Sequence, residues 1–193
     1  MMKELKKVAV AALAGVAFTS PSALANLVSD PGFESDMNCS NQSASGRGGG
    51  AFYSDATHCP FVLHAPHSGL MSAAFGTVSS LGFISQAIST DPGQRYDFTF
   101  WLAGDNGFPN EFVALWSGNQ IFDQVNVMGT DWVQYSFIQV ATSSSTIIAF
   151  GGRNGPSWLR LDDVSVVTIP EPPSLALLGI GLVGICWRRR IKA

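Results

Sequence analysis

Asp162 is the carboxylate whose position most clearly requires a chemical partner. It alternates with Val164 and Val166 in a stretch, 157–168, that we expect to form a strand, so its side chain should share their apolar face. An unpaired charge on the interior side of a sheet is costly. A hard cation bound by carboxylate and main-chain oxygens would neutralise it. The alternatives are an ion pair with Arg160 and an exposed side chain.

Trp101 is the best candidate for stacking on a sugar ring. It alternates with Phe98 and Phe100, which places it on the polar face of its expected strand. A flat ring packs against sugar C–H groups, while nearby amides and carboxylates bind the hydroxyls. Tyr53 and two further tryptophans, Trp116 and Trp132, rank lower, because aromatic residues of a sandwich are more often core. Loop residues that would complete a site at one edge are Asp105, Asn106, Phe108, Arg153, Asn154 and Trp158.

Cys39 and Cys59 flank a loop rich in serine and glycine, residues 40–58. In an exported protein such a pair predicts a disulfide. The loop-entropy estimate gives that bridge about 3 kcal/mol of stabilisation. The competing hypothesis is a metal cluster, with or without Cys39, although its spacing fits no standard zinc pattern. Its members would be His58, Cys59, His64 and His67.

Catalysis has little support in the sequence. No Gly-x-Ser-x-Gly elbow, phosphate-binding glycine loop or His-Glu-x-x-His motif occurs. A glycosidase would need two carboxylates that face a shared cleft. Glu111 could be assigned that role with Asp105 or with Asp123, and solvated carboxylates are the simpler interpretation. We therefore expect a protein that is not an enzyme.

The elements that must position these residues are strands. Tyr96, Phe98, Phe100 and Leu102 alternate with polar residues, and the stretch 131–140 shows the same period of two. Turn residues separate the stretches at short intervals, which favours an all-β antiparallel sandwich of the jelly-roll kind. The expected strands are 26–34, 50–54, 60–64, 70–76, 81–89, 94–103, 111–116, 120–127, 131–140, 145–150 and 157–168.

The charged residues divide the chain into three parts. The middle, residues 26–169, has four arginines and no lysine against ten aspartates and two glutamates, a formal charge of −8. Binding to nucleic acid depends on Lys and Arg that neutralise phosphates, so this composition argues against such a partner. A length of 144 residues fits one domain with a full hydrophobic core.

The first 25 residues have the pattern of a secretory signal peptide. Three lysines precede an apolar stretch from Val8 to Phe18, and small residues follow at Ala23 and Ala25. We expect a signal helix and cleavage by signal peptidase before Asn26. The alternative is an uncleaved anchor or an amphipathic first helix of the fold.

The last 24 residues, 170–193, combine three ordered elements. Pro170, Glu171 and Pro172 come first, then an apolar run at about 175–187, then a basic end at 188–192. The run of 13 residues is short for a spanning helix, which needs about 20. The tail resembles the PEP-CTERM sorting signal, in which Pro170, Glu171, Pro172, Arg188, Arg189 and Arg190 would be the motif residues.

This resemblance implies a short C-terminal hydrophobic helix, transient insertion in the inner membrane, and processing by an exosortase. The protein would then be secreted to the cell surface or extracellular matrix of a bacterium. A plain single-pass anchor is the alternative.

A second resemblance spans most of the middle and rests on the order of short motifs. These are Pro31-Gly32-Phe33-Glu34 near the start, Ile84-Ser85-Gln86-Ala87-Ile88, the turn Asp91-Pro92-Gly93, and Leu161-Asp162-Asp163-Val164 at the end. The order is similar to that of galactose-binding-domain-like β-sandwiches, a fold shared by many carbohydrate-binding modules. First and last strands lie close together in such sandwiches. The resemblance implies a structural Ca²⁺ there, with Glu34 and Asp162 as ligands.

The sequence therefore predicts an exported, non-catalytic sandwich that binds a glycan, such as the producer's own extracellular polysaccharide. The alternative is a structural matrix or surface protein of the same fold that has no defined sugar site.

Overall fold

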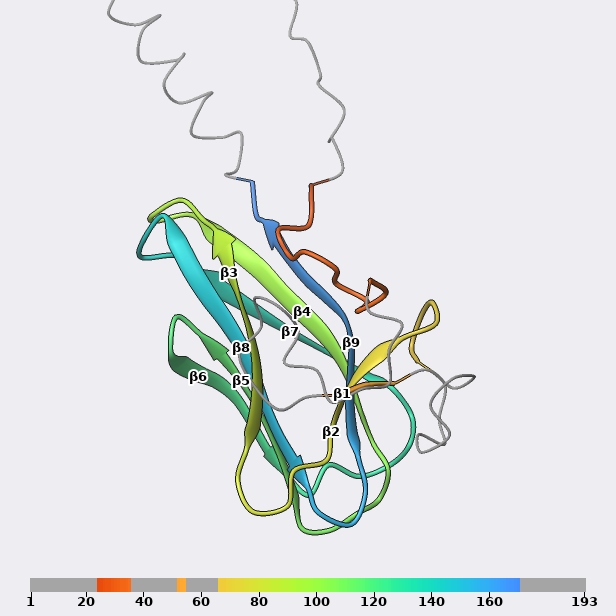
Figure 1. Cartoon of the computed structure of the whole chain (residues 1–193). Helices are drawn as coiled ribbons and strands as arrows, with labels where there is room; N and C mark the ends of the chain where they lie inside the picture. Colours follow the sequence, from red (N-terminus) through yellow and green to blue (C-terminus); the bar gives the residue numbers. More distant parts are fainter. Residues whose placement is uncertain (1–23, 36–51, 55–65, 171–193) are drawn as a thin grey trace, which may run out of the picture.

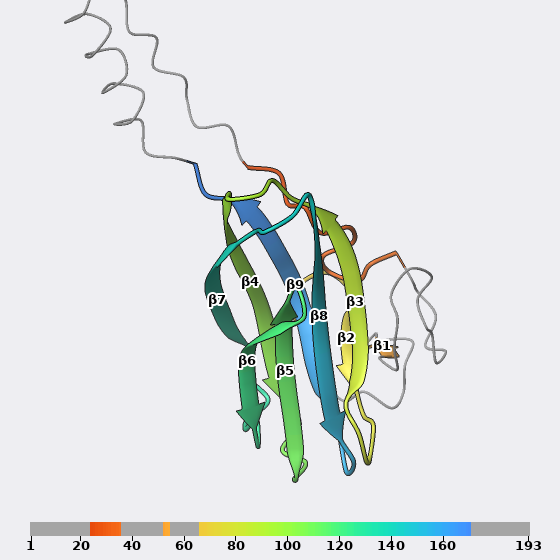
Figure 2. The same ribbon diagram turned by 90° about the vertical axis from the view of Figure 1, so that its left-hand side faces the viewer.

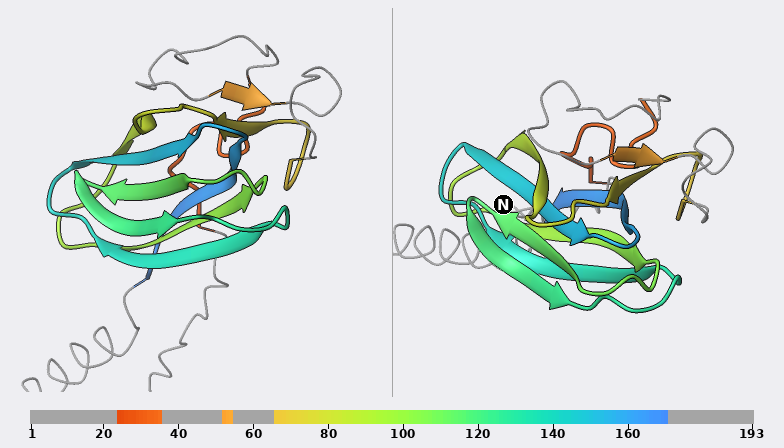
Figure 3. Two further views of the ribbon diagram at one scale, coloured as in Figure 1. Left: turned by 90° about the horizontal axis from the view of Figure 1, so that it is seen from below. Right: turned by 60° about the horizontal axis from the view of Figure 1, so that its bottom comes forward.

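Nine antiparallel strands form two sheets in the computed structural model, which describes residues 24–35, 52–54 and 66–170. One sheet has the order β1-β2-β9-β4-β7 and the other β3-β8-β5-β6. The sheets lie face to face, as Figure 2 and Figure 3 show. The strands are β1 (Phe52–Ser54), β2 (Ser72–Phe75), β3 (Gly82–Ser89), β4 (Arg95–Gly104), β5 (Asn110–Trp116), β6 (Asn119–Val125), β7 (Val133–Val140), β8 (Ser145–Asn154) and β9 (Leu159–Thr168).

The alternation of apolar and polar residues in β4 and β7 separates core-facing from outward-facing side chains, as expected from the sequence. Phe98 and Phe100 of β4 are fully buried, and they pair with Phe137 and Tyr135 of β7. Rings from the facing sheet complete the packing, since Phe100 lies edge-on to Phe150 with their centroids 5.2 Å apart. The all-β antiparallel sandwich expected from the sequence is thus the observed fold.

The expected strand at 26–34 is wrong, because bends and turns occupy this segment. Its residues Asp30 and Phe33 have φ values of 51° and 61°, a left-handed conformation outside the extended region of regular strands. Even so, the main-chain nitrogen of Leu27 donates to Val166 of β9. The stretch therefore lies along β9 without joining the sheet.

Several expectations lie outside the described residues. These are the signal helix, the strand at 60–64, the Cys39–Cys59 disulfide and the hydrophobic helix at about 175–187. In the part of the chain that the structure describes, no helix is long and apolar enough to span a membrane.

A β-bulge in β9 determines where Asp162 points. Leu161 pairs with Leu102 and Val166 with Phe98, so five steps along β9 match four along β4. The extra residue is accommodated at Asp163, whose φ is 45°. The expectation that Asp162 shares a face with Val164 and Val166 is therefore wrong. Asp162 pairs with Trp101 and lies on the outer face of the five-stranded sheet.

Two different segments flank the β2 side of β9. Strand β2 pairs with Leu159–Leu161 only, and beyond the bulge the N-terminal segment 24–35 takes over. In this second part of β9, after the bulge, the main-chain nitrogen of Val164 donates to the main-chain oxygen of Pro31. The bulge lies at the junction between the two segments, and Figure 1 shows the N-terminal segment near one end of β9 and β2 nearer the other.

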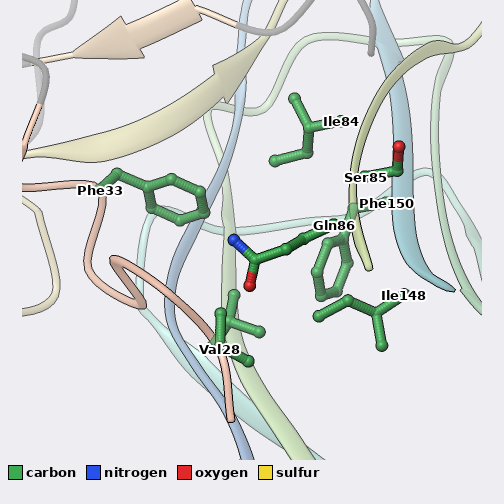
Figure 4. A pocket seen from close by; sticks show the side chains of 8 residues that line it. Val28, Phe33, Ile84, Ser85, Gln86, Ile148 and Phe150 are labelled. Carbon is green, nitrogen blue, oxygen red and sulfur yellow. The ribbon is translucent and has the colours of Figure 1, made fainter. Parts of the chain in front are cut away.

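The side chain of Phe33 anchors the N-terminal segment to the core. It is 4% exposed and, with Val28, lines a small apolar cavity of about 20 Å³ against β3 and β8 (Figure 4). Gln86 of β3 faces the same cavity, and its amide exchanges hydrogen bonds with the main chain of Ser29 at 2.8 and 3.1 Å. These contacts hold the neighbouring Glu34 beside β9.

The loops gather at the two ends of the sandwich. The turns at 90–94 and 141–144 lie at one end, where the described chain also begins and ends, at Leu24 and Pro170 (Figure 1). Loops 76–81, 104–109, 126–132 and 155–158 lie at the opposite end. We call these the terminal end and the loop end.

Candidate functional site

Asp162 ties the bulge to the segment that precedes β2. Its side chain is fully buried, and Oδ2 accepts hydrogen bonds from the main-chain nitrogens of His67 and Ser68 at 2.8 and 3.2 Å. Oδ1 accepts from the nitrogen of Asp163 at 2.7 Å. Because β2 begins only at Ser72, the carboxylate provides the acceptors that a neighbouring strand would otherwise supply at this height.

Burial raises the pKa of Asp162 from its usual 3.8 to about 7. The hydrogen bonds from Ser68, Asp163 and His67 act in the opposite direction, while the negative charge of Asp163 raises the pKa further. The site thus holds more negative charge than its surroundings readily stabilise.

Glu34 binds the next part of the same segment. Its Oε1 accepts from the main-chain nitrogens of Leu70 and Met71, both at 2.9 Å. A Cβ built on Gly32 would lie 3.6 Å from Cγ of Glu34 and 3.7 Å from Oδ1 of Asp162, so the two acidic side chains approach the same glycine. The structure therefore brings together the two residues that the sequence singled out.

The chemistry of these groups suits a hard cation, because every side-chain atom that could bind it is an oxygen and the carboxylate of Asp162 is buried. Glu34 and Asp162 could each contribute an oxygen. Among the described residues, however, no three His, Cys, Asp or Glu side chains are grouped closely enough to hold a metal ion. A cation bound here would need main-chain or water oxygens as well.

His67 connects the bulge to the aromatic side chains of the outer face. Its Nδ1 lies 2.5 Å from Oδ2 of Asp163. The ring stacks on Trp101, with centroids 3.8 Å apart and an interplanar angle of 18°, and meets Trp132 edge-on at 5.8 Å. We call Trp101, Trp132 and His67 the aromatic cluster. Trp101 and Trp132 are both partly exposed, and the His67 side chain is 27% exposed.

The buried guanidinium of Arg160 packs against Trp132 of the aromatic cluster. Its Nε lies 3.1 Å from Oδ1 of Asp105, and a terminal nitrogen donates to the main-chain oxygen of Thr130. The guanidinium carbon is 4.9 Å from the centroid of Trp132, a cation–π contact. Burial lowers the pKa of Arg160, and the charge and hydrogen bond of Asp105 counteract that effect. Arg160 thus pairs with Asp105 and not, as one alternative held, with Asp162.

The other predicted ligand residues are dispersed. Asn106 and Phe108 lie in an exposed loop at the loop end, where Asn106 accepts from the nitrogen of Gly129. Arg153 faces outward from the opposite sheet, 2.9 Å from Glu111. Asn154 is fully buried. A single site cannot include Arg153 together with Trp101.

Of the other tryptophans, Trp116 agrees with the low rank that the sequence gave it as a sugar platform, whereas Trp132 does not. Trp158 packs across Gly76, since a Cβ there would lie 2.4 Å from its ring. Trp116 is 4% exposed and belongs to the core, beside Tyr96. Trp132, ranked low, lies in the aromatic cluster. The side chain of Tyr53 lies outside the described part.

His67 is the residue that sequence reasoning missed. Its only sequence context was the metal cluster with His58, Cys59 and His64, and these three lie outside the described residues. It contacts Trp101 across 34 positions of the chain and Asp163 across 96. No local pattern reports such a contact, so only the fold could reveal it.

Comparison with known proteins identifies the tail. The chain carries the PEP-CTERM protein-sorting motif, matched at residues 168–190. This motif is that of an exported protein that an exosortase sorts to the cell surface. A search of curated protein sequences finds no match.

Solved structures match the sandwich. TmCBM61, solved in complex with β-1,4-galactotriose, is 17% identical with a TM-score of 0.54, and the match covers 75% of this chain and 99% of that one. The family 22 carbohydrate-binding module of Clostridium thermocellum Xyn10B is 14% identical with a TM-score of 0.53, covering 77% and 97%. The K2 adhesin domain of Lys-gingipain is 13% identical with a TM-score of 0.52, covering 70% and 96%. At these identities the likeness shows the fold alone: a β-sandwich of the kind found in carbohydrate-binding modules.

The buried pair of Arg160 and Asp105 gives a test of how the aromatic cluster is supported. Replacing Asp105→Ala leaves a guanidinium that is 1% exposed without its carboxylate. We expect the free energy of unfolding, measured by urea denaturation of the exported protein, to fall by about 3–5 kcal/mol. Asp123→Ala is the matched control, because Asp123 is exposed and its loss should change stability by about 0.5 kcal/mol or less. Equal effects of the two variants would contradict the assigned role of Asp105.

Proposed function

We propose that this protein is a non-catalytic glycan-binding protein that an exosortase processes and delivers to the cell surface or extracellular matrix. The aromatic cluster would hold the glycan on the outer face of the five-stranded sheet. The producer's own extracellular polysaccharide is the proposed ligand, because the exported protein would meet it first.

The aromatic cluster is the observation that carries this proposal. Trp101 and Trp132 are partly exposed on one face, and His67 and Arg160 hold them in defined orientations. A fixed indole ring provides a flat apolar surface for sugar C–H groups at little entropic cost. Gln134 pairs with Trp101 on the neighbouring strand, and Ser136 with Thr99, so hydrogen-bonding groups adjoin the platform.

The charge of the domain narrows the class of glycan. With a formal charge of −8 and no lysine in residues 26–169, the domain would repel a strongly anionic polysaccharide at long range. Arg160, whose guanidinium lies against Trp132, is already paired with Asp105. A neutral glycan therefore suits the site best.

The carboxylates considered for hydrolysis have other partners, which supports a non-catalytic protein. Glu111 forms an ion pair with Arg153 and Asp105 with Arg160, on opposite faces of the sandwich. Asp123 accepts a hydrogen bond from Gln120 on an exposed strand.

A calcium ion bound by Glu34 and Asp162 is the proposed structural cofactor. It would neutralise the buried charge where the N-terminal segment, the segment before β2 and the bulge meet. Its part would be to join these three segments, without direct contact with the glycan.

Glycan binding is tested with the exported protein purified from the producing bacterium. The ligands are that bacterium's extracellular polysaccharide and β-1,4-galactan. Trp101→Ala should weaken binding at least about tenfold, as expected for an aromatic anchor. Ile138→Ala is the matched control, because Ile138 is 56% exposed on the same outer face and outside the aromatic cluster. Saturable binding that survives Trp101→Ala would place the site elsewhere, and absence of binding to both polysaccharides would favour a purely structural protein.

Processing is tested by mass spectrometry of the extracellular fraction. We expect peptides of the sandwich and none from residues 175–193, because the tail would be removed near Pro170-Glu171-Pro172. Glu171→Ala should shift the protein to the membrane fraction, whereas Asp91→Ala, which removes an exposed carboxylate at the same end of the sandwich, should not. A released protein that retains residues 175–193 would contradict processing.

Calcium should raise the melting temperature of the exported protein, and chelation should reverse the change. A free calcium concentration of about 100 times the dissociation constant would raise the free energy of unfolding by about 2.7 kcal/mol. Glu34→Gln should remove the calcium effect while it keeps Oε1 as the acceptor for Leu70 and Met71. Asp123→Asn, the control, should respond to calcium as the unaltered protein does.

The calcium effect should also depend on pH in a defined direction. Without a cation, the pKa of Asp162 is raised to about 7 in the folded state, so the folded protein holds this proton more tightly than the unfolded chain. The stabilisation by that proton is complete below about pH 4 and is lost as the pH rises through about 7. Calcium competes with the proton, so the rise in melting temperature should be larger at pH 8 than at pH 5. Equal shifts at both pH values would exclude Asp162 as a ligand.

A further inference from the structure

We propose that His67 is the positioning residue of the glycan platform and that it transmits the geometry of the β9 bulge to Trp101. This inference rests on the proposed glycan-binding function. It assigns to His67 a role that neither the sequence motifs nor the comparisons give it.

Three contacts from different parts of the fold fix His67. Its main-chain nitrogen donates to Oδ2 of Asp162 at 2.8 Å, which sets the height of the residue along β9. Its Nδ1 lies 2.5 Å from Oδ2 of Asp163, which sets the rotation of the ring. The ring then lies 3.8 Å from that of Trp101 and 18° from parallel. The two carboxylates of the bulge thus determine where the imidazole stands.

The stack on His67 settles which part of Trp101 a sugar can use. One face of the indole is in contact with the imidazole, so the platform is the opposite face of the ring. Without His67, the tryptophan on the outer face of β4 would have other rotamers available. Binding would then have to immobilise a side chain that the stack already holds in place.

The loss of affinity expected without His67 follows from the need to immobilise Trp101 on binding. Ordering one rotamer-rich side chain on binding corresponds to about a 3- to 10-fold loss of affinity. His67→Ala should therefore weaken binding to the producer's extracellular polysaccharide by about this factor. Trp101→Ala should have a larger effect, because it removes the platform itself.

Two further variants separate positioning from general support of the fold. His67→Phe keeps the main-chain hydrogen bond to Asp162 and a flat ring against Trp101 but loses the contact with Asp163, so it should bind more tightly than His67→Ala and less tightly than the unaltered protein. Ser68→Ala is the matched control, since Ser68 Oγ donates to the other oxygen of Asp163 at 2.7 Å. It should lower the melting temperature and leave the affinity unchanged.

The measurements are affinity electrophoresis in gels that contain the polysaccharide, thermal unfolding, and near-ultraviolet circular dichroism, which reports immobilised indoles. The inference is supported if His67→Ala loses affinity and indole dichroism, His67→Phe recovers part of both, and Ser68→Ala changes only stability. It is overturned if His67→Ala binds normally while Trp101→Ala does not, or if Ser68→Ala loses as much affinity as His67→Ala. If the unaltered protein does not bind, the proposed function itself fails, and this role of His67 fails with it.

Discussion

The buried carboxylate of Asp162 is the contact that the rest of the site depends on. At the bulge, β9 passes from one neighbour, β2, to another, the N-terminal segment, and main-chain groups there lack a regular ladder partner. Asp162 accepts hydrogen bonds from both His67 and Ser68, and from Asp163 beside it. The cost is a partly desolvated negative charge, which accounts for the raised pKa and for the suitability of the place for a cation. Asp162 therefore both supports the fold at the bulge and holds His67, which contacts the candidate ligand platform.

Much of the fold could be predicted because β4 and β7 alternate without interruption. Side chains of a strand change face at every residue, so Phe98 and Phe100 mark the core and Trp101 the surface. The same rule failed at Asp162, because one added residue at Asp163 reverses the faces from that point on. In the sequence the bulge shows only as a change of phase, because the apolar residues Leu159 and Leu161 lie at odd positions and Val164 and Val166, after two adjacent aspartates, lie at even ones. The segment 26–34 failed for a related reason, since its left-handed residues Asp30 and Phe33 interrupt an otherwise strand-like pattern.

The candidate site could be predicted only where a local pattern reports it. Trp101 follows from the polar face of one strand, whereas its partners come from distant parts of the chain. Trp132 and Arg160 approach each other because loop 126–132 packs against the start of β9, and His67 reaches Trp101 because Asp162 holds it there. Arg153 was grouped with Trp101 by its loop-like neighbours in the sequence, yet it faces outward from the opposite sheet. Proximity in a sandwich depends on which sheet a strand joins, and that information is not local.

The way β9 ends has a consequence for how the molecule is presented. The strand is anchored one residue beyond its end at Thr168, because the nitrogen of Ile169 donates to the main-chain oxygen of Arg95 and the oxygen of Ile169 accepts from the side-chain amide of Gln94. The sorting motif, matched from residue 168, overlaps this end of the strand. Asp162 and Ile169 are seven positions apart, and at a rise of about 3.3 Å per residue this part of the chain spans at most about 23 Å. The sandwich would thus act as a rigid spacer that holds the aromatic cluster at a fixed distance from the point where the sorting motif begins.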